Sequence, residues 1–203
     1  MGFSESPIGP VDSVPAGLVG GWRSWYHRHS TRFYKPNPRN SWLSWIGEEH
    51  VAVGSLPTGL TLPLLRDAGV THVINCRATS QTWLSQDLAA ERALFGPARV
   101  VHAPMWDFGQ PQHPRLWSAA ARYVADVLAD EPTAGVLIHC HQGRRRSILL
   151  TYAVLRLRGH DADTAADLIA THRTEGVLVK AYAGSVERWL DAGAVPIGRL
   201  RLR

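Results

Sequence analysis

The sequence predicts an α/β protein with a central, mostly parallel sheet flanked by helices. Short runs of β-branched and aliphatic residues, of the length of buried strands, alternate with stretches whose apolar residues recur at helical spacing. Strands joined through helices form layered, largely parallel sheets. In addition, a loop with one cysteine and three arginines lies between a strand and a helix, which places it at the carboxyl edge of the sheet.

The composition allows one domain of ordinary size with an extension. The chain has 203 residues, of which 45% are hydrophobic, and no apolar run approaches the length of a membrane span. Its two cysteines do not indicate a secreted disulfide framework, and residues 1–21 lack a basic-then-apolar signal pattern, so we expect a cytoplasmic protein. The formal charge of +5 fits an anionic substrate or a membrane surface, but arginine-rich composition alone produces the same balance.

Residues 1–41 are predicted to form an N-terminal extension. Residues 1–21 are rich in glycine, proline and serine, whereas the stretch from Trp22 to Trp45 combines four tryptophans with five basic residues and no acid. This mixture is typical both of an arm packed onto its domain and of peripheral contact with a membrane surface. Because the sequence has no recognisable nucleic-acid-binding motif, no nucleic-acid partner is expected.

The first half of the domain is predicted to contain three strands and two helices. Aliphatic runs bounded by turn residues predict the strands, and the stretches between them supply the helices. In chain order, the expected elements are a strand over 50–56, a helix over 60–68, a turn and strand over 69–76, a loop and helix over 79–95, and a strand over 98–103.

The second half is predicted to contain one strand and four helices. Residues 114–129 form an amphipathic helix, because Trp117, Ala121 and Val124 fall on one face. The other expected elements are a strand over 136–138, a helix from Ser147, a helix over 161–172 capped by Asp161 or Asp163, and a last helix over 178–190.

The loop between the strand 136–138 and the helix from Ser147 has the composition of a phosphate cradle. A tight turn into a helix N-terminus points several backbone N–H groups into one hollow, where the helix dipole adds positive charge. Gly143 allows the backbone to curl. These groups and Arg146 lower the pKa of the Cys140 thiol, so that its thiolate is available to attack phosphorus. Arg146 grips two phosphoryl oxygens, and Ser147 donates a hydrogen bond to the sulfur.

The string His139-Cys140-x5-Arg146-Ser147 resembles the catalytic loop of the cysteine-dependent protein tyrosine phosphatases, in their dual-specificity branch. The strands over 50–56 and 69–76 are also similar to those of this branch. The resemblance implies a phosphatase domain over 42–193, followed by a basic tail over 194–203. It further implies a metal-free and cofactor-free phosphomonoesterase that forms a cysteinyl phosphate, in which His139 orders the loop by hydrogen bonding.

A phosphomonoesterase of this kind also needs an acid that protonates the leaving oxygen and then activates water. Asp107 is the candidate, because it follows the strand over 98–103 and lies between Trp106 and Phe108, whose apolar rings favour the protonated carboxyl group. Its position about thirty residues before the cysteine matches the general acid of the resembled family. A surface turn aspartate is the alternative interpretation.

The substrate class is left open between phosphoproteins, carrying phosphotyrosine, phosphoserine or phosphothreonine, and anionic phospholipids. The domain is too short for the loops that deepen the cleft of tyrosine-specific relatives. Arg144 lies where phosphoinositide and phosphatidylglycerophosphate phosphatases of this superfamily have Lys or Arg. The string Trp25-Tyr26-His27-Arg28 resembles the phosphatidylglycerophosphate type, whereas Arg145 replaces a small residue of that type. Arg145 either binds a second phosphate or points to solvent. The candidate substrate-binding residues are His141, Gln142, Gly143, Arg144 and Arg145.

Parts of the sequence are compatible with three other interpretations. A rhodanese-like sulfurtransferase also uses a cysteine loop, with Arg145 at the position of its arginine, but has no need of Asp107. A metal bound between His139 and His141 would lack further ligands and would quench the thiolate. Cys76 ends a strand expected beside that of Cys140; the family resemblance suggests a redox partner, while a small buried hydrophobe is equally compatible with the sequence.

Overall fold

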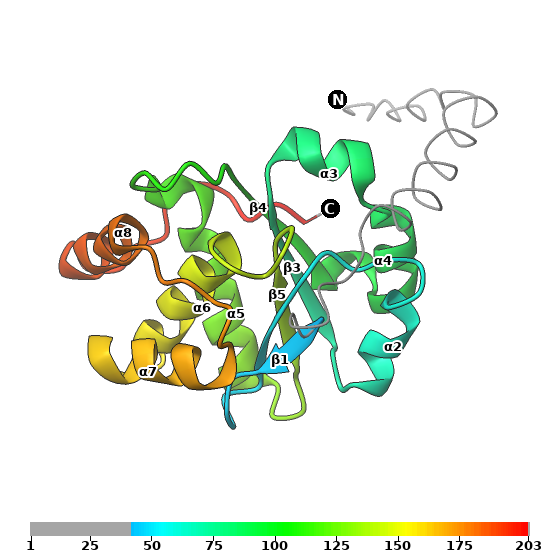
Figure 1. Cartoon of the computed structure of the whole chain (residues 1–203), viewed down its shortest axis with the longest axis horizontal. Coiled ribbons are helices and arrows are strands. Elements are labelled where there is room, and N and C mark those ends of the chain that lie inside the picture. The colour runs from blue at the N-terminus through cyan, green and yellow to red at the C-terminus, as the bar shows by residue number, and fades with distance from the viewer. Residues whose placement is uncertain (1–41, 203) are drawn as a thin grey trace, which may run out of the picture.

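The computed structural model describes residues 42–202, which form one five-stranded sheet in the order β1-β2-β5-β3-β4 (Figure 1). β1 pairs antiparallel with β2, and all other pairs are parallel. The predicted α/β class with a mostly parallel sheet is therefore confirmed. The strands are β1 (Leu43–Trp45), β2 (Val51–Gly54), β3 (His72–Arg77), β4 (Val100–Met105) and β5 (Val136–His139).

The helices cover both faces of this sheet. Figure 1 shows α5 to α8 on one side of the sheet and α2 and α4 on the other. Their bounds are α2 (Leu62–Asp67), α3 (Thr79–Ser85), α4 (Leu88–Phe95), α5 (Ser118–Asp130), α6 (Arg146–Leu157), α7 (Ala162–His172) and α8 (Lys180–Asp191), with short 3₁₀ turns η1 (Pro97–Arg99) and η2 (Pro114–Leu116). None of the helices in the described part of the chain is both long and apolar enough to span a membrane.

The central strand β5 is buried on both faces, and this position determines where the loop after it lies. Val136 and Ile138 belong to the larger hydrophobic cluster under α5, α6 and α8, whereas Leu137 belongs to the smaller cluster under α2 and α4. This alternation is the two-residue period of a strand between two layers. The loop after β5 therefore emerges from the middle of the sheet, at its carboxyl edge.

The predicted elements are present, with differences at their ends. β1 is missing from the prediction because it is a three-residue strand of half-buried residues at the sheet edge. The loop and helix expected over 79–95 are two helices, since the chain is extended at Gln86 and Asp87 caps α4 by accepting from Ala90 N at 3.0 Å. Asp161, rather than Asp163, caps α7, accepting from Thr164 N at 2.7 Å.

The segment after α8 lies against the domain. Arg201 O accepts a hydrogen bond from His102 N at 2.8 Å, and Leu202 forms an antiparallel bridge with Val101 of β4. Ile197 N donates to Ser118 Oγ at the start of α5, at 2.9 Å. This segment is the described part of the predicted basic tail, 194–203. Residues 1–41, with most of the stretch from Trp22 to Trp45, lie outside the described residues.

Candidate active site

The loop from Cys140 to Arg145 joins β5 to α6 and passes close to β2. Gly143 has a φ of +67°, and a Cβ built on it would lie 2.5 Å from Gly54 O and 2.7 Å from Arg173 Nη2. Both the left-handed conformation and the lack of space require glycine at this position. The predicted role of Gly143 in the turn is consistent with this geometry.

Arg173, which was not among the predicted site residues, holds this loop from behind. Its side chain is fully buried. It donates from Nε to Gly143 O at 3.2 Å and from Nη2 to Gln142 O at 3.2 Å. Glu175 pairs with its Nη1 at 3.0 Å. The guanidinium thus binds two carbonyl groups of the loop. It does not occupy the loop N–H groups, which remain available to a ligand.

Replacement of Arg173 is expected to destabilise the protein. In Arg173→Met, two loop carbonyl groups lose their donor and Glu175 is left largely buried without its ion pair, so the free energy of unfolding should fall by about 3 kcal/mol. Urea denaturation measures this change, with Arg92→Met on the exposed end of α4 as the matched control. Unchanged unfolding of Arg173→Met would refute the anchoring role.

The Cys140 sulfur lies at the bottom of the loop. Burial tends to raise the pKa of this thiol, but the Ser147 hydroxyl, the Arg146 charge and the backbone N–H groups of Ser147 and Arg144 outweigh burial and lower the pKa below its ordinary value. The Ser147 Oγ atom lies 3.5 Å from Sγ. The structure thus places Cys140, Arg146 and Ser147 together as predicted, in an environment that favours the thiolate.

Arg146, the first residue of α6, is held with one edge of its guanidinium facing the cavity. Its Nη1 donates to Gln81 Oε1 at 2.8 Å and to Met105 O at 3.1 Å. Its buried Nε has no hydrogen-bond partner among the described residues. An unpaired donor on a buried cation is costly, so this N–H is a ready ligand for a phosphoryl oxygen.

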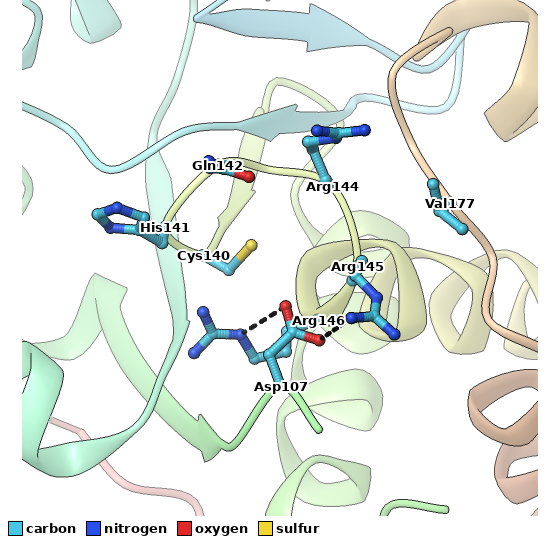
Figure 2. A pocket seen from close by; sticks show the side chains of 8 residues that line it. All are labelled: Asp107, Cys140, His141, Gln142, Arg144, Arg145, Arg146 and Val177. Carbon is cyan, nitrogen blue, oxygen red and sulfur yellow. Dashed lines mark ion pairs between the residues drawn. The ribbon is translucent and has the colours of Figure 1, made fainter. Parts of the chain in front are cut away.

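Asp107 follows β4, and its carboxylate enters the same cavity. Arg145 Nη1 lies 3.2 Å from Oδ1, and Arg146 Nε lies 3.9 Å from Oδ2 (Figure 2). Tyr182, which the sequence does not single out, donates to Oδ1 at 3.0 Å. Trp106 and Phe108 stack on each other and are 49% and 71% exposed, so the predicted apolar surroundings of Asp107 are wrong.

These groups line one cavity of about 380 Å³, a volume in the range of small-molecule sites. Figure 2 shows the loop curving around Cys140, with Asp107 facing it across the opening. The predicted substrate-binding side chains take part in this lining, whereas Gly143 contributes its backbone to the turn. The lining residues are Asp107, Cys140, His141, Gln142, Arg144, Arg145, Arg146 and Val177.

His139 and His141 occupy different environments. His141 is exposed at the cavity, whereas His139 is fully buried beneath the loop. Gln86 Nε2 lies 3.3 Å from His139 Nε2 and can only donate, so the ring proton is on Nδ1, which lies 3.2 Å from Cys140 O and donates to it. Burial is the main cause that lowers the pKa of His139 to about 3, which keeps the ring neutral.

Cys76 is fully buried near the end of β3, which pairs with β5 in parallel. The register pairs Asn75 with His139, which directly precede Cys76 and Cys140 in the sequence. Besides burial, which is the main cause, the Cys140 thiol raises the pKa of Cys76, so the two residues lie near each other. Within the described part of the chain both cysteines are free thiols. Burial raises the pKa of Cys76 well above its ordinary value. Among residues 42–202 no cluster of three or more His, Cys, Asp or Glu residues is arranged to hold a metal ion.

Comparison with known proteins shows a shared fold at low sequence identity. No family model matches the chain. PTPMT1 in complex with PI(5)P superposes with a TM-score of 0.64 at 19% identity, over 76% of this chain and 100% of that chain. Human DUSP28 gives 0.61 at 16% identity, over 78% and 99%. Tk-PTP in its active form gives 0.61 at 21% identity, over 74% and 97%. The chain therefore has the fold of the protein tyrosine phosphatases, at the size of their dual-specificity branch.

Proposed function

We propose that the protein is a cysteine-dependent phosphomonoester hydrolase of the dual-specificity type, acting on phosphotyrosine, phosphoserine or phosphothreonine. The observation that carries this proposal is one cavity that holds three groups: Cys140, whose thiolate is stabilised, Arg146, whose Nε has no hydrogen-bond partner among the described residues, and the carboxyl group of Asp107. A nucleophile, an oxyanion ligand and an acid in one cavity are the three groups that cysteinyl-phosphate chemistry needs. The fold shared with known phosphatases supports the same conclusion.

The reaction proceeds in two steps. The Cys140 sulfur attacks phosphorus, the bond from phosphorus to the leaving oxygen breaks, and Asp107 gives its proton to that oxygen. Asp107 then removes a proton from water, which attacks phosphorus; the bond between sulfur and phosphorus breaks, and inorganic phosphate leaves. Arg146 binds phosphoryl oxygens in both steps, and Ser147 stabilises the sulfur as it departs.

An anionic phospholipid is the second candidate substrate. Arg144 and Arg145 line the opening of the cavity, where they would face additional negative charge on a headgroup. A related fold has been crystallised with a phosphoinositide, as PTPMT1 in complex with PI(5)P. For this alternative we propose a cytoplasmic enzyme that contacts the membrane surface peripherally through the stretch from Trp22 to Trp45.

A substrate panel tests the proposal. Phosphate release from p-nitrophenyl phosphate, from singly phosphorylated tyrosine, serine and threonine peptides, and from vesicles containing phosphoinositides or phosphatidylglycerophosphate should identify a phosphatase. A higher rate of phosphate release from peptides than from vesicles supports a protein substrate. A higher rate from vesicles supports a lipid substrate. Absence of release from every substrate, with thiosulfate–cyanide transfer instead, would establish a sulfurtransferase.

Cys76 is proposed as a reversible redox partner of Cys140. Its place near Cys140 supports this proposal, because a disulfide would protect the nucleophile from over-oxidation. After limited peroxide treatment, peptide mapping should find a Cys76–Cys140 disulfide and full recovery with dithiothreitol. In Cys76→Ala, Cys140 should advance irreversibly to sulfinic acid. If wild type and Cys76→Ala lose activity at the same irreversible rate, Cys76 is only a core residue.

A further inference from the structure

The two oxygens of the Asp107 carboxylate have different surroundings. Oδ1 accepts a hydrogen bond from the Tyr182 hydroxyl at 3.0 Å and lies 3.2 Å from Arg145 Nη1. Oδ2 faces Nε of Arg146, the proposed phosphoryl ligand, at 3.9 Å. Figure 2 shows the carboxylate between the two guanidinium groups, with the Cys140 sulfur across the cavity. One oxygen is therefore anchored, and the other is presented to the reaction.

We propose that Tyr182 and Arg145 are positioning residues for the general acid, holding Oδ1 so that the proton on Oδ2 faces the leaving oxygen. The proposal rests on the hydrolase function given above and extends it by assigning the two groups that aim Asp107. It also changes the expectation for Arg145, because its guanidinium lies on the acid rather than pointing to solvent. Proton transfer by Asp107 is efficient only when its geometry is fixed.

Tyr182 is suited to this role because it binds both a side chain and the backbone of the loop after β4 that carries Asp107 and Gly109, here called the acid loop. The residue is fully buried in α8, and its hydroxyl also accepts from Gly109 N at 3.2 Å. Burial raises the pKa of Tyr182, so the phenol remains a donor in the neutral range. A buried side chain of a long helix gives the exposed acid loop a rigid reference point.

Arg145 connects the same carboxylate to the catalytic loop. Its guanidinium carbon lies 5.9 Å from the centroid of the Tyr182 ring, a cation–π distance. A Cβ on Gly109 would lie 2.9 Å from Arg145 Nη2, so the guanidinium passes close to the backbone of the acid loop. Gly109 also has a φ of +74°. The catalytic loop, the acid loop and α8 are thus joined at Asp107.

The test uses substrates that differ in their need for an acid. Phenyl phosphate has a poorer leaving group than p-nitrophenyl phosphate, so its kcat/KM depends more on proton donation. In Tyr182→Phe and Arg145→Met, kcat/KM for phenyl phosphate should fall about 10-fold more than for p-nitrophenyl phosphate, the loss expected for one charged hydrogen bond. Arg145→Lys should restore part of this loss.

A double-mutant cycle separates aiming of the acid from any other role. In the Asp107→Asn background, Tyr182→Phe and Arg145→Met should leave the ratio between the two substrates unchanged, because the group they position no longer donates a proton. Tyr123→Phe and Arg66→Met are the matched controls, with melting temperatures measured for all variants. The proposal would be overturned if kcat/KM fell equally for both substrates, or if it fell by the same factor with and without Asp107. Inactivity of the unmodified chain would instead refute the proposed hydrolase function.

Discussion

Cys140→Ser is expected to abolish turnover, lowering kcat by at least about 10⁴-fold, while inorganic phosphate still binds. The donors that make the thiol acidic do not ionise a serine hydroxyl, so the nucleophile is lost. The phosphate ligands, including Arg146 and the loop N–H groups, remain in place. Phosphate affinity by calorimetry and turnover of p-nitrophenyl phosphate measure the two effects separately. Substantial residual turnover would place the nucleophile elsewhere.

The lowered pKa of Cys140 also predicts a pH dependence. The thiolate is the reactive form, and a pKa below the ordinary value makes it the major form at a lower pH than in a free cysteine. Alkylation of Cys140 by iodoacetate should therefore reach its maximum rate at a lower pH than alkylation of a free cysteine. A rate with the same pH dependence as that of a free cysteine would contradict the lowered pKa.

Asp107→Asn is expected to lower kcat by about 10²–10⁴-fold. An amide neither protonates the leaving oxygen nor takes a proton from water, so the variant lacks the acid of the first step and the base of the second. The kcat for phenyl phosphate measures this loss. Asp126→Asn, on the exposed surface of α5, is the matched control. A full rate in Asp107→Asn would mean that another group is the acid.

The elements and the catalytic loop were predictable because their signals are local. Residues 136–138 form a short aliphatic strand. Cys140 and Gly143 lie in the loop that follows it, and Arg146 begins the next helix. These residues are close together in the sequence, so their spacing alone carries the signal, although the folded loop also needs Arg173. The environment of Asp107 was not predictable in this way, because adjacency to Trp106 and Phe108 does not tell which way each side chain points.

The sequence by itself determined the α/β class, the order of its main elements and the grouping of Cys140 with Arg146 and Ser147, since short-range periodicity and one turn suffice for these. Only the tertiary structure decided that Arg173 supports the loop and that Tyr182 and Arg145 meet at Asp107. Tyr182 and Asp107 are 75 residues apart, and Arg173 and Gly143 are 30 apart. Such contacts depend on how α7 and α8 pack against the sheet, and burial of apolar surface, which has no directional code in the sequence, determines that packing.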